Sequence, residues 1–238
     1  MVQRPSRPTE APRRGTPSKS HCRPLACREE GKAQHGSAVE RNAVRIASPE
    51  LLLVGREHPL RKATEDCIRE VYARTCGARL TVFPDLLFAA CGREDALLCA
   101  AGLRFGDEGY FSECYLDQPI ESLLGAHAGQ RVARSSIFEI TTLVSRAPDV
   151  SAAFLRRIGR LGRYWGFEWA FFTASERLRE LLRGMGIPLI LLGEAQPGRV
   201  SHPEAWGSYY RCAPRVCAID GRGIAAPLRP AAVVAGHA

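Results

Sequence analysis

The chain has 238 residues, of which 45% are hydrophobic and 24% are charged, and these near-average values exclude a wholly disordered or collagen-like protein. The longest apolar runs, such as Leu51–Val54 and Ile187–Leu192, fall far short of the ~20 residues that a membrane-spanning helix needs, so we expect no integral membrane segment. The net charge of +8 is concentrated at the N-terminus, because residues 1–48 hold ten Lys or Arg against four Asp or Glu. A nucleic-acid partner is therefore not expected.

Both ends of the chain differ in composition from its centre. Residues 1–42 are rich in Pro, Ser, Arg and Gly and nearly lack large apolar side chains, which predicts a disordered basic tail. Residues 222–238 are rich in Ala, Pro and Val and are predicted to form a loose C-terminal tail, which leaves a single domain at 43–221. The nine cysteines lack C-x-x-C spacing, and the basic N-terminus lacks the apolar segment of a secretory signal. We expect reduced thiols, a cytoplasmic location and no metal site.

The centre of the chain alternates between short apolar runs and segments with helical periodicity. In chain order, the predicted elements are a strand at Leu51–Val54, a helix from Pro59 to Gly77, strands at Leu86–Cys91, Ala96–Leu103 and Tyr110–Tyr115, a helix or loop opening at 117–121, a strand at Ser136–Val144, a helix at Ser151–Trp165, a strand at Trp169–Thr173, a helix at Glu176–Arg183, and strands at Pro188–Leu192 and Arg215–Ile219. This order implies an α/β (α+β) protein with a mixed sheet and helices on both faces.

Several segments of this centre occur together in a known protein family. They are His58–Tyr72, Phe83–Phe88, Gly102–Arg104, Tyr115–Glu121, Glu139–Ile140, Trp169–Thr173 with Leu178–Arg179, and Trp206–Tyr210. In this ordered set, the chain resembles the thermostable hemolysin family. That family looks like a branch of the GNAT fold of N-acyltransferases, close to the acyl-homoserine-lactone synthases. The resemblance implies a GNAT-like, mainly antiparallel central sheet flanked by helices.

Glu139 is the predicted catalytic residue. It lies in a predicted strand whose two faces are both largely apolar, so the strand is expected at the centre of the sheet. Burial raises the pKa of a carboxyl group, and a raised pKa suits a general base near neutral pH. In GNAT enzymes, a carboxylate on the equivalent strand often deprotonates the accepting amine, which is the role that the resemblance implies for Glu139. The alternative is a structural ion pair with Arg134 or Arg131.

Arg146 and Ser151 are the predicted phosphate-binding residues. The helix expected from Ser151 should direct the amide groups of its first turn at a ligand, and such a helix end binds anions. GNAT proteins hold the pyrophosphate of coenzyme A at this place with a glycine-containing loop, whereas this chain has no glycine there and carries Asp149. Arg146 is expected to hold a phosphate of acyl-CoA or of the phosphopantetheine on an acyl carrier protein. The alternative is that Asp149 or Ser151 caps the helix.

Two further groups are candidates for substrate binding. The polar group follows a predicted strand and consists of Asp117, Gln118 and Glu121. It either lines the acceptor side of a cleft or caps a helix that starts at Pro119. The aromatic group precedes the last predicted strand and consists of Trp206, Tyr209 and Tyr210. It either walls an apolar acyl pocket or packs the core.

Three functional hypotheses follow. The first is an acyltransferase in which a small amine attacks an acyl thioester, supplied by coenzyme A or an acyl carrier protein, with Glu139 as base. The second is a membrane-active hemolysin, as the family name says, for which the central residues offer no strongly amphipathic segment. The third is a non-catalytic ligand-binding module on the same fold.

Overall fold

The apolar runs and helical segments of the centre form a seven-stranded sheet with helices packed on it. The computed structural model describes residues 49–223, so the predicted tails at 1–42 and 222–238 lie, except for Arg222 and Gly223, outside the described residues. The helices are α1 (Arg61–Cys76), α2 (Ile120–Ala128), α3 (Pro148–Tyr164) and α4 (Glu176–Gly184). The strands are β1 (Glu50–Val54), β2 (Leu86–Cys91), β3 (Leu97–Phe105), β4 (Ile137–Ser145), β5 (Trp169–Ala174), β6 (Ile190–Glu194) and β7 (Arg215–Asp220).

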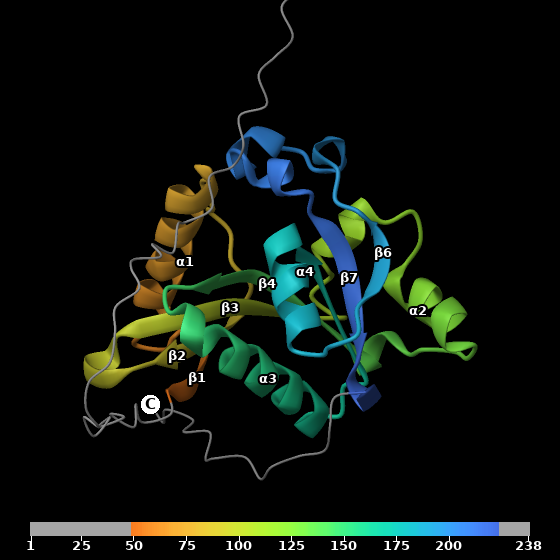
Figure 1. Cartoon of the computed structure of the whole chain (residues 1–238), viewed down its shortest axis with the longest axis horizontal. Helices are drawn as coiled ribbons and strands as arrows, with labels where there is room; N and C mark the ends of the chain where they lie inside the picture. Colours follow the sequence, from red (N-terminus) through yellow and green to blue (C-terminus); the bar gives the residue numbers. More distant parts are fainter. Residues whose placement is uncertain (1–48, 224–238) are drawn as a thin grey trace, which may run out of the picture. The chain divides into compact units, whose positions relative to one another are not determined.

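The strands follow the order β1-β2-β3-β4-β5-β7-β6 across the sheet (Figure 1). All neighbours are antiparallel except β4 and β5, which run parallel. A parallel pair needs a crossover connection, and α3 provides it. The mixed, mainly antiparallel sheet with flanking helices, which the family resemblance implies, is thereby confirmed.

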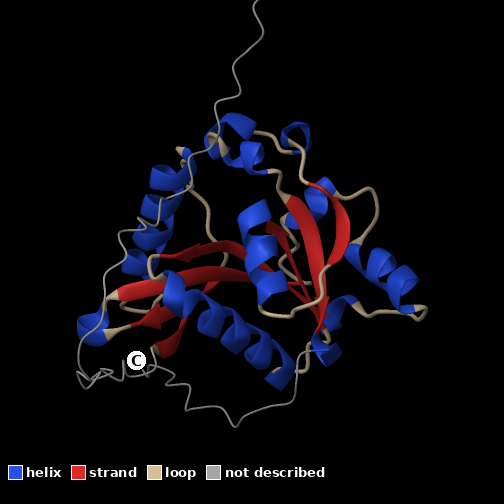
Figure 2. Ribbon diagram, in the orientation of Figure 1, coloured by secondary structure: helices blue, strands red, loops and turns tan. Residues whose placement is uncertain are grey.

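Helices cover both faces of the sheet (Figure 2). On one face, Ile158 of α3 and Leu182 of α4 pack into the core with side chains of the central strands. On the other face, Ile68 of α1 packs against β1, β2 and β3, while Leu124 of α2 packs against β5 and β7. The alternation of side chains along each strand supplies an apolar surface to both helix layers. The central strands are therefore buried on both sides, whereas the edge strands β1 and β6 are partly exposed.

The parallel strands β4 and β5 pair only at one end. Their ladder joins Ile137–Glu139 to Trp169–Phe171, and the remaining residues of the two strands do not pair with each other. The register of β4 against β3 shifts between Ala100 and Gly102, and Thr142 lies in the resulting bulge with a φ of 46°. A bulge bends a strand and increases its twist. The divergence of β4 from β5 opens the middle of the sheet.

Two elements differ from the prediction. The strand predicted at Tyr110–Tyr115 is a loop followed by the 3₁₀ turn η2 (Ser112–Tyr115). Its amides cannot join a neighbouring strand, because those of Phe111 and Ser112 bond a buried carboxylate. The helix predicted from Ser151 starts earlier, at Pro148, since the fixed φ of proline suits the first helical position.

Candidate functional site

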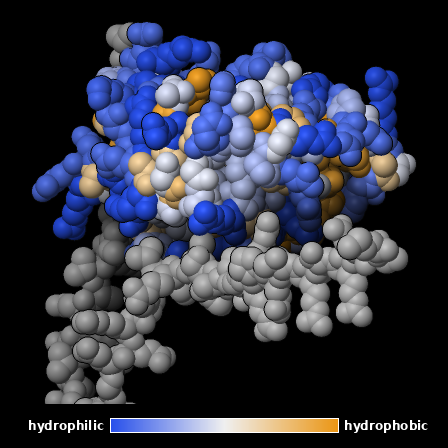
Figure 3. Space-filling model, turned by 90° about the horizontal axis from the view of Figure 1, so that it is seen from above, coloured by the Kyte–Doolittle hydropathy of each residue, from blue (hydrophilic) through white to orange (hydrophobic). Residues whose placement is uncertain are grey.

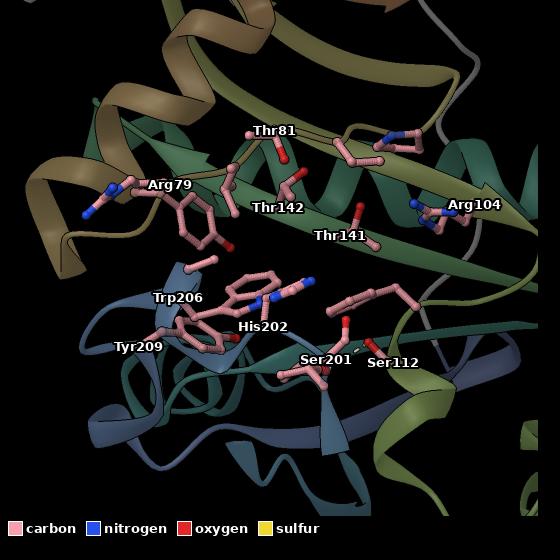
Figure 4. Close-up of a pocket in the computed structure, with 18 of the residues that line it drawn as sticks. Arg79, Thr81, Arg104, Ser112, Thr141, Thr142, Ser201, His202, Trp206 and Tyr209 are labelled. Carbon is pink, nitrogen blue, oxygen red and sulfur yellow. Dashed lines mark hydrogen bonds between the residues drawn. The ribbon is translucent and has the colours of Figure 1, made fainter. Parts of the chain in front are cut away.

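A cavity of about 320 Å³ lies where β4 separates from β5 (Figure 4). Its walls come from segments that are distant in sequence. They are the middle of β4 with Thr173 of β5, α1 with the segment 79–84 that follows it, η2, and the segment 200–209, which contains the 3₁₀ turn η5 (Pro203–Trp206). The volume falls within the ~300–1,000 Å³ that is usual for small-molecule sites. The divergence of the two strands therefore creates space for a ligand.

One side of the cavity is aromatic. The indole of Trp206 stacks on Phe111 with ring centroids 5.4 Å apart, and it lies 5.4 Å from the ring of Tyr209 and 6.3 Å from that of Tyr72. The predicted residues Trp206 and Tyr209 thus line the cavity. Tyr210 does not line it, and its hydroxyl lies 2.9 Å from that of the tyrosine at the end of η2. The aromatic wall offers an apolar surface to a hydrocarbon chain.

Backbone contacts hold the aromatic wall against the end of α1. The N–H groups of Ser208 and Arg79 donate to the carbonyl oxygens of Cys76 and Ala205, both at 2.7 Å. Between these contacts, Gly207 has a φ of 55°, and a Cβ there would collide with the carbonyl oxygen of Cys76. Only glycine allows so close an approach in this conformation. Gly207 therefore fixes the position of the aromatic wall.

The opposite side of the cavity is polar and belongs to β4. The hydroxyl oxygens of Thr141 and Thr142 are buried and have no hydrogen-bond partner among the described residues. Thr141 fits because its neighbour on β3 is Gly102, where a Cβ would lie 2.5 Å from the threonine hydroxyl. Thr142 has a positive φ, which is strained for a β-branched side chain. Buried hydroxyls without a partner cost free energy unless a ligand satisfies them, so this wall indicates a polar ligand group.

Within residues 49–223, the charged residues that line the cavity are two arginines. Arg104 of β3 is half-buried, while Arg79 is exposed. Figure 4 places Arg104 at one end of the cavity, near Thr141, and Arg79 at the other end. No Asp or Glu among the described residues lines the cavity. Its walls therefore carry a positive potential that favours anionic ligands.

Glu139 is fully buried and lies behind the wall of the cavity rather than in it. Its two carboxylate oxygens accept the N–H groups of Phe111 and Ser112, each at 2.7 Å. Burial raises the pKa of the Glu139 carboxyl above its ordinary value, although these bonds and the nearby Arg104 act in the opposite direction. Glu139 thus lacks the direct contact with substrate that a general base needs. Its carboxylate instead holds the loop before η2 in position.

Two hydroxyl groups connect Glu139 to the cavity. Ser112, whose amide bonds the carboxylate, places its hydroxyl 2.8 Å from that of Thr173 on β5. Both Ser112 and Thr173 line the cavity (Figure 4 labels Ser112). A hydroxyl donates one hydrogen bond while it accepts others, so a pair of them can pass a proton. The carboxylate is therefore linked to the cavity through Ser112 and Thr173.

The alternative of an ion pair at Glu139 is wrong, because Arg134 bonds other carboxylates. Its guanidinium donates to both oxygens of Glu113 at 2.7 Å and to Glu121 at 2.8 Å. Burial raises the pKa of Glu113, but the bonds from Arg134 and from the first amide of α2 outweigh this effect and hold the pKa below its usual range. Arg131 is exposed and forms no ion pair with any described residue.

The predicted polar group does not line the cavity. Glu121 belongs to the cluster around Arg134, Asp117 pairs with Arg199 at the surface, and Gln118 is exposed. None of these side chains caps α2, whose first amide instead donates to Glu113 at 3.0 Å. The contacts of this group therefore match neither a place in the cavity wall nor a helix cap.

The predicted phosphate-binding residues are both engaged in contacts within the protein. Arg146 pairs with Glu70 of α1, and the Ser151 hydroxyl donates to that of Ser145 at 2.8 Å. Asp149 lies in the first turn of α3, where its charge opposes an incoming phosphate. The capping alternative is wrong, because the N-cap is Ala147 and no side chain caps the helix. These residues do not fit the pyrophosphate of coenzyme A.

The sequence analysis did not single out several residues of the cavity. They are Tyr72, Arg79, Arg104, Ser112, Thr141, Thr142 and Thr173. The paired threonines carried a signal, because adjacent hydroxyls in an otherwise apolar central strand need partners. Tyr72, Arg104 and Thr173 stood in segments that carry the family resemblance, but nothing in those segments indicated a cavity, because it joins parts of the chain whose proximity only the fold establishes.

Comparisons with known proteins identify the family and the fold. The family described as thermostable hemolysin matches residues 54–224, and no curated protein matches the chain. A solved CoA-dependent acyl-homoserine lactone synthase, BjaI with SAM and isopentyl-CoA, has a TM-score of 0.50 and 11% identity over 74% of this chain and 84% of its own. FeeM, an N-acyl amino acid synthase from uncultured soil microbes, has a TM-score of 0.49 and 12% identity over 74% of this chain and 93% of its own. At these identities the likeness concerns the fold alone.

Proposed function

The chain belongs to the thermostable hemolysin family, and from this premise we propose that it is an acyltransferase that moves an acyl group from a thioester to a small amine. The observation that carries the proposal is the cavity between β4 and β5, which combines an aromatic wall with unpartnered threonine hydroxyls. An acyl thioester has the same two parts, since a hydrocarbon chain is joined to carbonyl and amide groups. The acyl chain would lie against Trp206 and Tyr209, and the thioester near Thr141 and Thr142.

The unpaired part of β4 offers a place for the arm of the donor. Beyond Glu139, β4 has no partner strand on the side of β5, so its backbone groups are available there. A pantetheine arm contains two amides in an extended chain and can pair with such an edge as an added strand does. This placement would lead the thioester to the threonine wall.

The contacts at the start of α3 favour a carrier-protein donor over coenzyme A. Coenzyme A carries a pyrophosphate and a nucleotide in addition to its pantetheine arm. At the start of α3, Arg146 is already paired with Glu70 and Asp149 is itself negative, so neither is available to bind these phosphates. The phosphopantetheine of a carrier protein needs only one phosphate site. Carrier proteins are acidic, and α3 carries four arginines, Arg156, Arg157, Arg160 and Arg163, against one acidic residue.

In the proposed reaction, the amine nitrogen attacks the thioester carbonyl, the C–S bond breaks and the thiolate leaves. The nitrogen must lose a proton in this process. Thr173 would accept it while passing its own proton to the Ser112 hydroxyl, and Glu139, to which the side chain of Ser112 also bonds, would take the proton of that hydroxyl. Burial raises the pKa of Glu139 above its ordinary value, which makes it a stronger proton acceptor than an exposed carboxylate. Glu139 is thus a proton acceptor that acts through two hydroxyls.

Mass spectrometry of reaction mixtures tests the proposal. The full chain is incubated with an octanoyl carrier protein or octanoyl-CoA and a set of amino acids and polyamines, and N-octanoyl products are sought. Val200→Trp fills the cavity from a loop and should abolish the product, while Leu191→Trp, on an exposed edge position, should leave it unchanged. Melting curves of both variants exclude misfolding as the cause.

The outcomes separate the proposal from the other two hypotheses. Thioesters that raise the melting temperature without any turnover would indicate a binding module, and no effect of either donor would refute the proposal altogether. Release of dye from lipid vesicles would favour membrane activity. Among residues 49–223, no helix is both long and apolar enough to cross a membrane. The face shown in Figure 3 is mainly hydrophilic, with apolar side chains in small separate groups.

A further inference from the structure

The cavity contains one arginine that is built into the sheet. Arg104 comes from the antiparallel ladder between β3 and β4, one residue before the end of β3, where it lies directly opposite Glu139. Its backbone is therefore fixed, in contrast to that of Arg79, which follows α1 in a loop and is exposed. A rigid strand positions a binding group more accurately than a loop does.

No carboxylate of the described residues neutralises Arg104 through an ion pair. Glu139, its cross-strand neighbour, gives both oxygens to backbone amides. The two other described acids near Arg104 are Asp85, which pairs with Arg56, and Glu108, which forms no ion pair with Arg104. A half-buried guanidinium without an acidic partner retains its capacity to bind an anion. Arg104 is therefore available to a ligand in the cavity.

The hydroxyls of Thr141 and Thr142 lie on the same wall. Thr141 shares the face of the sheet with Arg104, because Gly102 pairs with Thr141 and Arg104 pairs with Glu139 in the same ladder. Both hydroxyls are buried without a partner. Figure 4 shows Thr141 beside Arg104 at one end of the cavity, with Thr142 further along the same wall, near Thr81. The hydroxyl of Thr141, which lies beside Arg104, can donate to an anionic oxygen, and that of Thr142 is left for the thioester.

We propose that the acceptor is a carboxylate-bearing amine of the amino-acid type and that Arg104 binds its carboxylate. This substrate class rests on the acyltransferase function proposed above. The planar fork of a guanidinium matches a carboxylate in two parallel hydrogen bonds. A phosphate dianion would call for a second cation beside Arg104, whereas Arg79 lies at the far end of the cavity. Arg104 lies opposite Glu139. Glu139 is bonded by Ser112, and Ser112 is bonded to Thr173. An acceptor whose amino and carboxylate groups are adjacent would therefore place its carboxylate at Arg104 and its amine near Thr173.

Binding of product-like probes tests this substrate class without turnover. N-octanoylglycine carries the carboxylate, and N-octanoylglycinamide is its neutral match. Calorimetric titration of the full chain should show the acid binding about 10- to 100-fold more tightly than the amide, the range for one hydrogen-bonded charge. Arg104→Gln should remove this difference, and Arg104→Lys should retain part of it. Arg93→Gln, at the exposed turn between β2 and β3, should change neither affinity.

Each remaining outcome overturns a specific statement. Equal affinities for the acid and the amide in the parent protein would refute a carboxylate-bearing acceptor while leaving acyl transfer intact. If Arg79→Gln instead of Arg104→Gln removes the preference, the residue assignment is wrong. If Arg104→Gln weakens 4′-phosphopantetheine and not N-octanoylglycine, Arg104 binds the phosphate of the donor. If neither octanoyl probe binds the parent, the proposed acyltransferase function itself fails. Melting curves of the free variants verify folding.

Discussion

Replacement of Glu139 by glutamine changes one oxygen that accepts hydrogen bonds into an NH₂ group that cannot accept one. In the parent protein, the two carboxylate oxygens accept the amides of Phe111 and Ser112, both at 2.7 Å. In the variant, one of these amides faces another donor in a fully buried site. The amide loses its partner and has no access to water, so the loop before η2 must shift or remain strained.

The magnitude follows from one lost acceptor. A buried donor without a partner costs about 1–3 kcal/mol, and the removal of a buried charge offsets part of this cost. We expect the unfolding free energy of Glu139→Gln to be lower by about 1–3 kcal/mol at pH 7. A broken buried ion pair would cost about 3–5 kcal/mol, but no arginine pairs with Glu139 among the described residues. Urea denaturation measures the difference.

The pH dependence supplies an independent check. Because burial raises the pKa of Glu139 in the folded protein, its protonated form contributes stability fully below the ordinary value of ~4.3, and this contribution is lost as the pH rises through the folded pKa. Glu139→Gln lacks this contribution. The stability advantage of the parent over the variant should therefore narrow as the pH rises from about 4. An advantage that widens would refute the reasoning, as would a variant that equals the parent in stability at pH 7.

Activity separates proton transfer from loop positioning. Loss of a general base lowers the rate by about 10²–10⁴-fold, and a displaced loop also lowers it, so Glu139→Gln alone decides little. Ser112→Ala and Thr173→Val keep both backbone bonds to the carboxylate and remove the hydroxyl link. Both should lower acyl transfer strongly at little cost in stability. Parent-like rates in these variants would refute the proton path through Ser112 and Thr173.

Three further predictions concern the walls of the cavity and the ion cluster. Gly207→Ala should destabilise the protein and weaken octanoyl binding, because the added Cβ would push the aromatic wall away from α1. Urea denaturation and calorimetric titration measure the two effects. The control Gly198→Ala, where a Cβ meets no atom within 4 Å, should change neither stability nor binding. Thr142→Gly should raise the unfolding free energy, since relief of about 1–3 kcal/mol of strain exceeds the ~0.5–1 kcal/mol entropic cost of glycine, while acyl transfer falls. Because Arg134 holds the pKa of Glu113 below its usual range, Glu113→Gln should be less stable than the parent at pH 7, and the gap should close as the pH falls through that lowered pKa.

The sequence by itself determined the order and type of most elements, because local patterns encode them. The strand predicted at Leu86–Cys91 matches β2 residue for residue, and the strands around Glu139 and Trp169 differ only at their ends. Alternation, helical periodicity and the placement of Pro and Gly act over a few residues, so they can be read without a fold. The two apolar faces of the strand around Glu139 also predicted that this strand is central and that Glu139 is buried, and both are confirmed.

Only the tertiary structure decided what surrounds Glu139 and what lines the cavity. The segment 110–115 has a strand-like sequence, but its amides bond the carboxylate of Glu139 across 27 residues of chain or more. Arg146 and Asp117, which stand at plausible sites in the sequence, are paired with Glu70 and Arg199 from other elements. A polar side chain acts on whichever partner the fold brings near it, and the energy of that contact has no counterpart in local sequence. For this reason the catalytic strand could be predicted, whereas Arg104, Thr141 and Thr173 emerge as site residues only when β4 parts from β5.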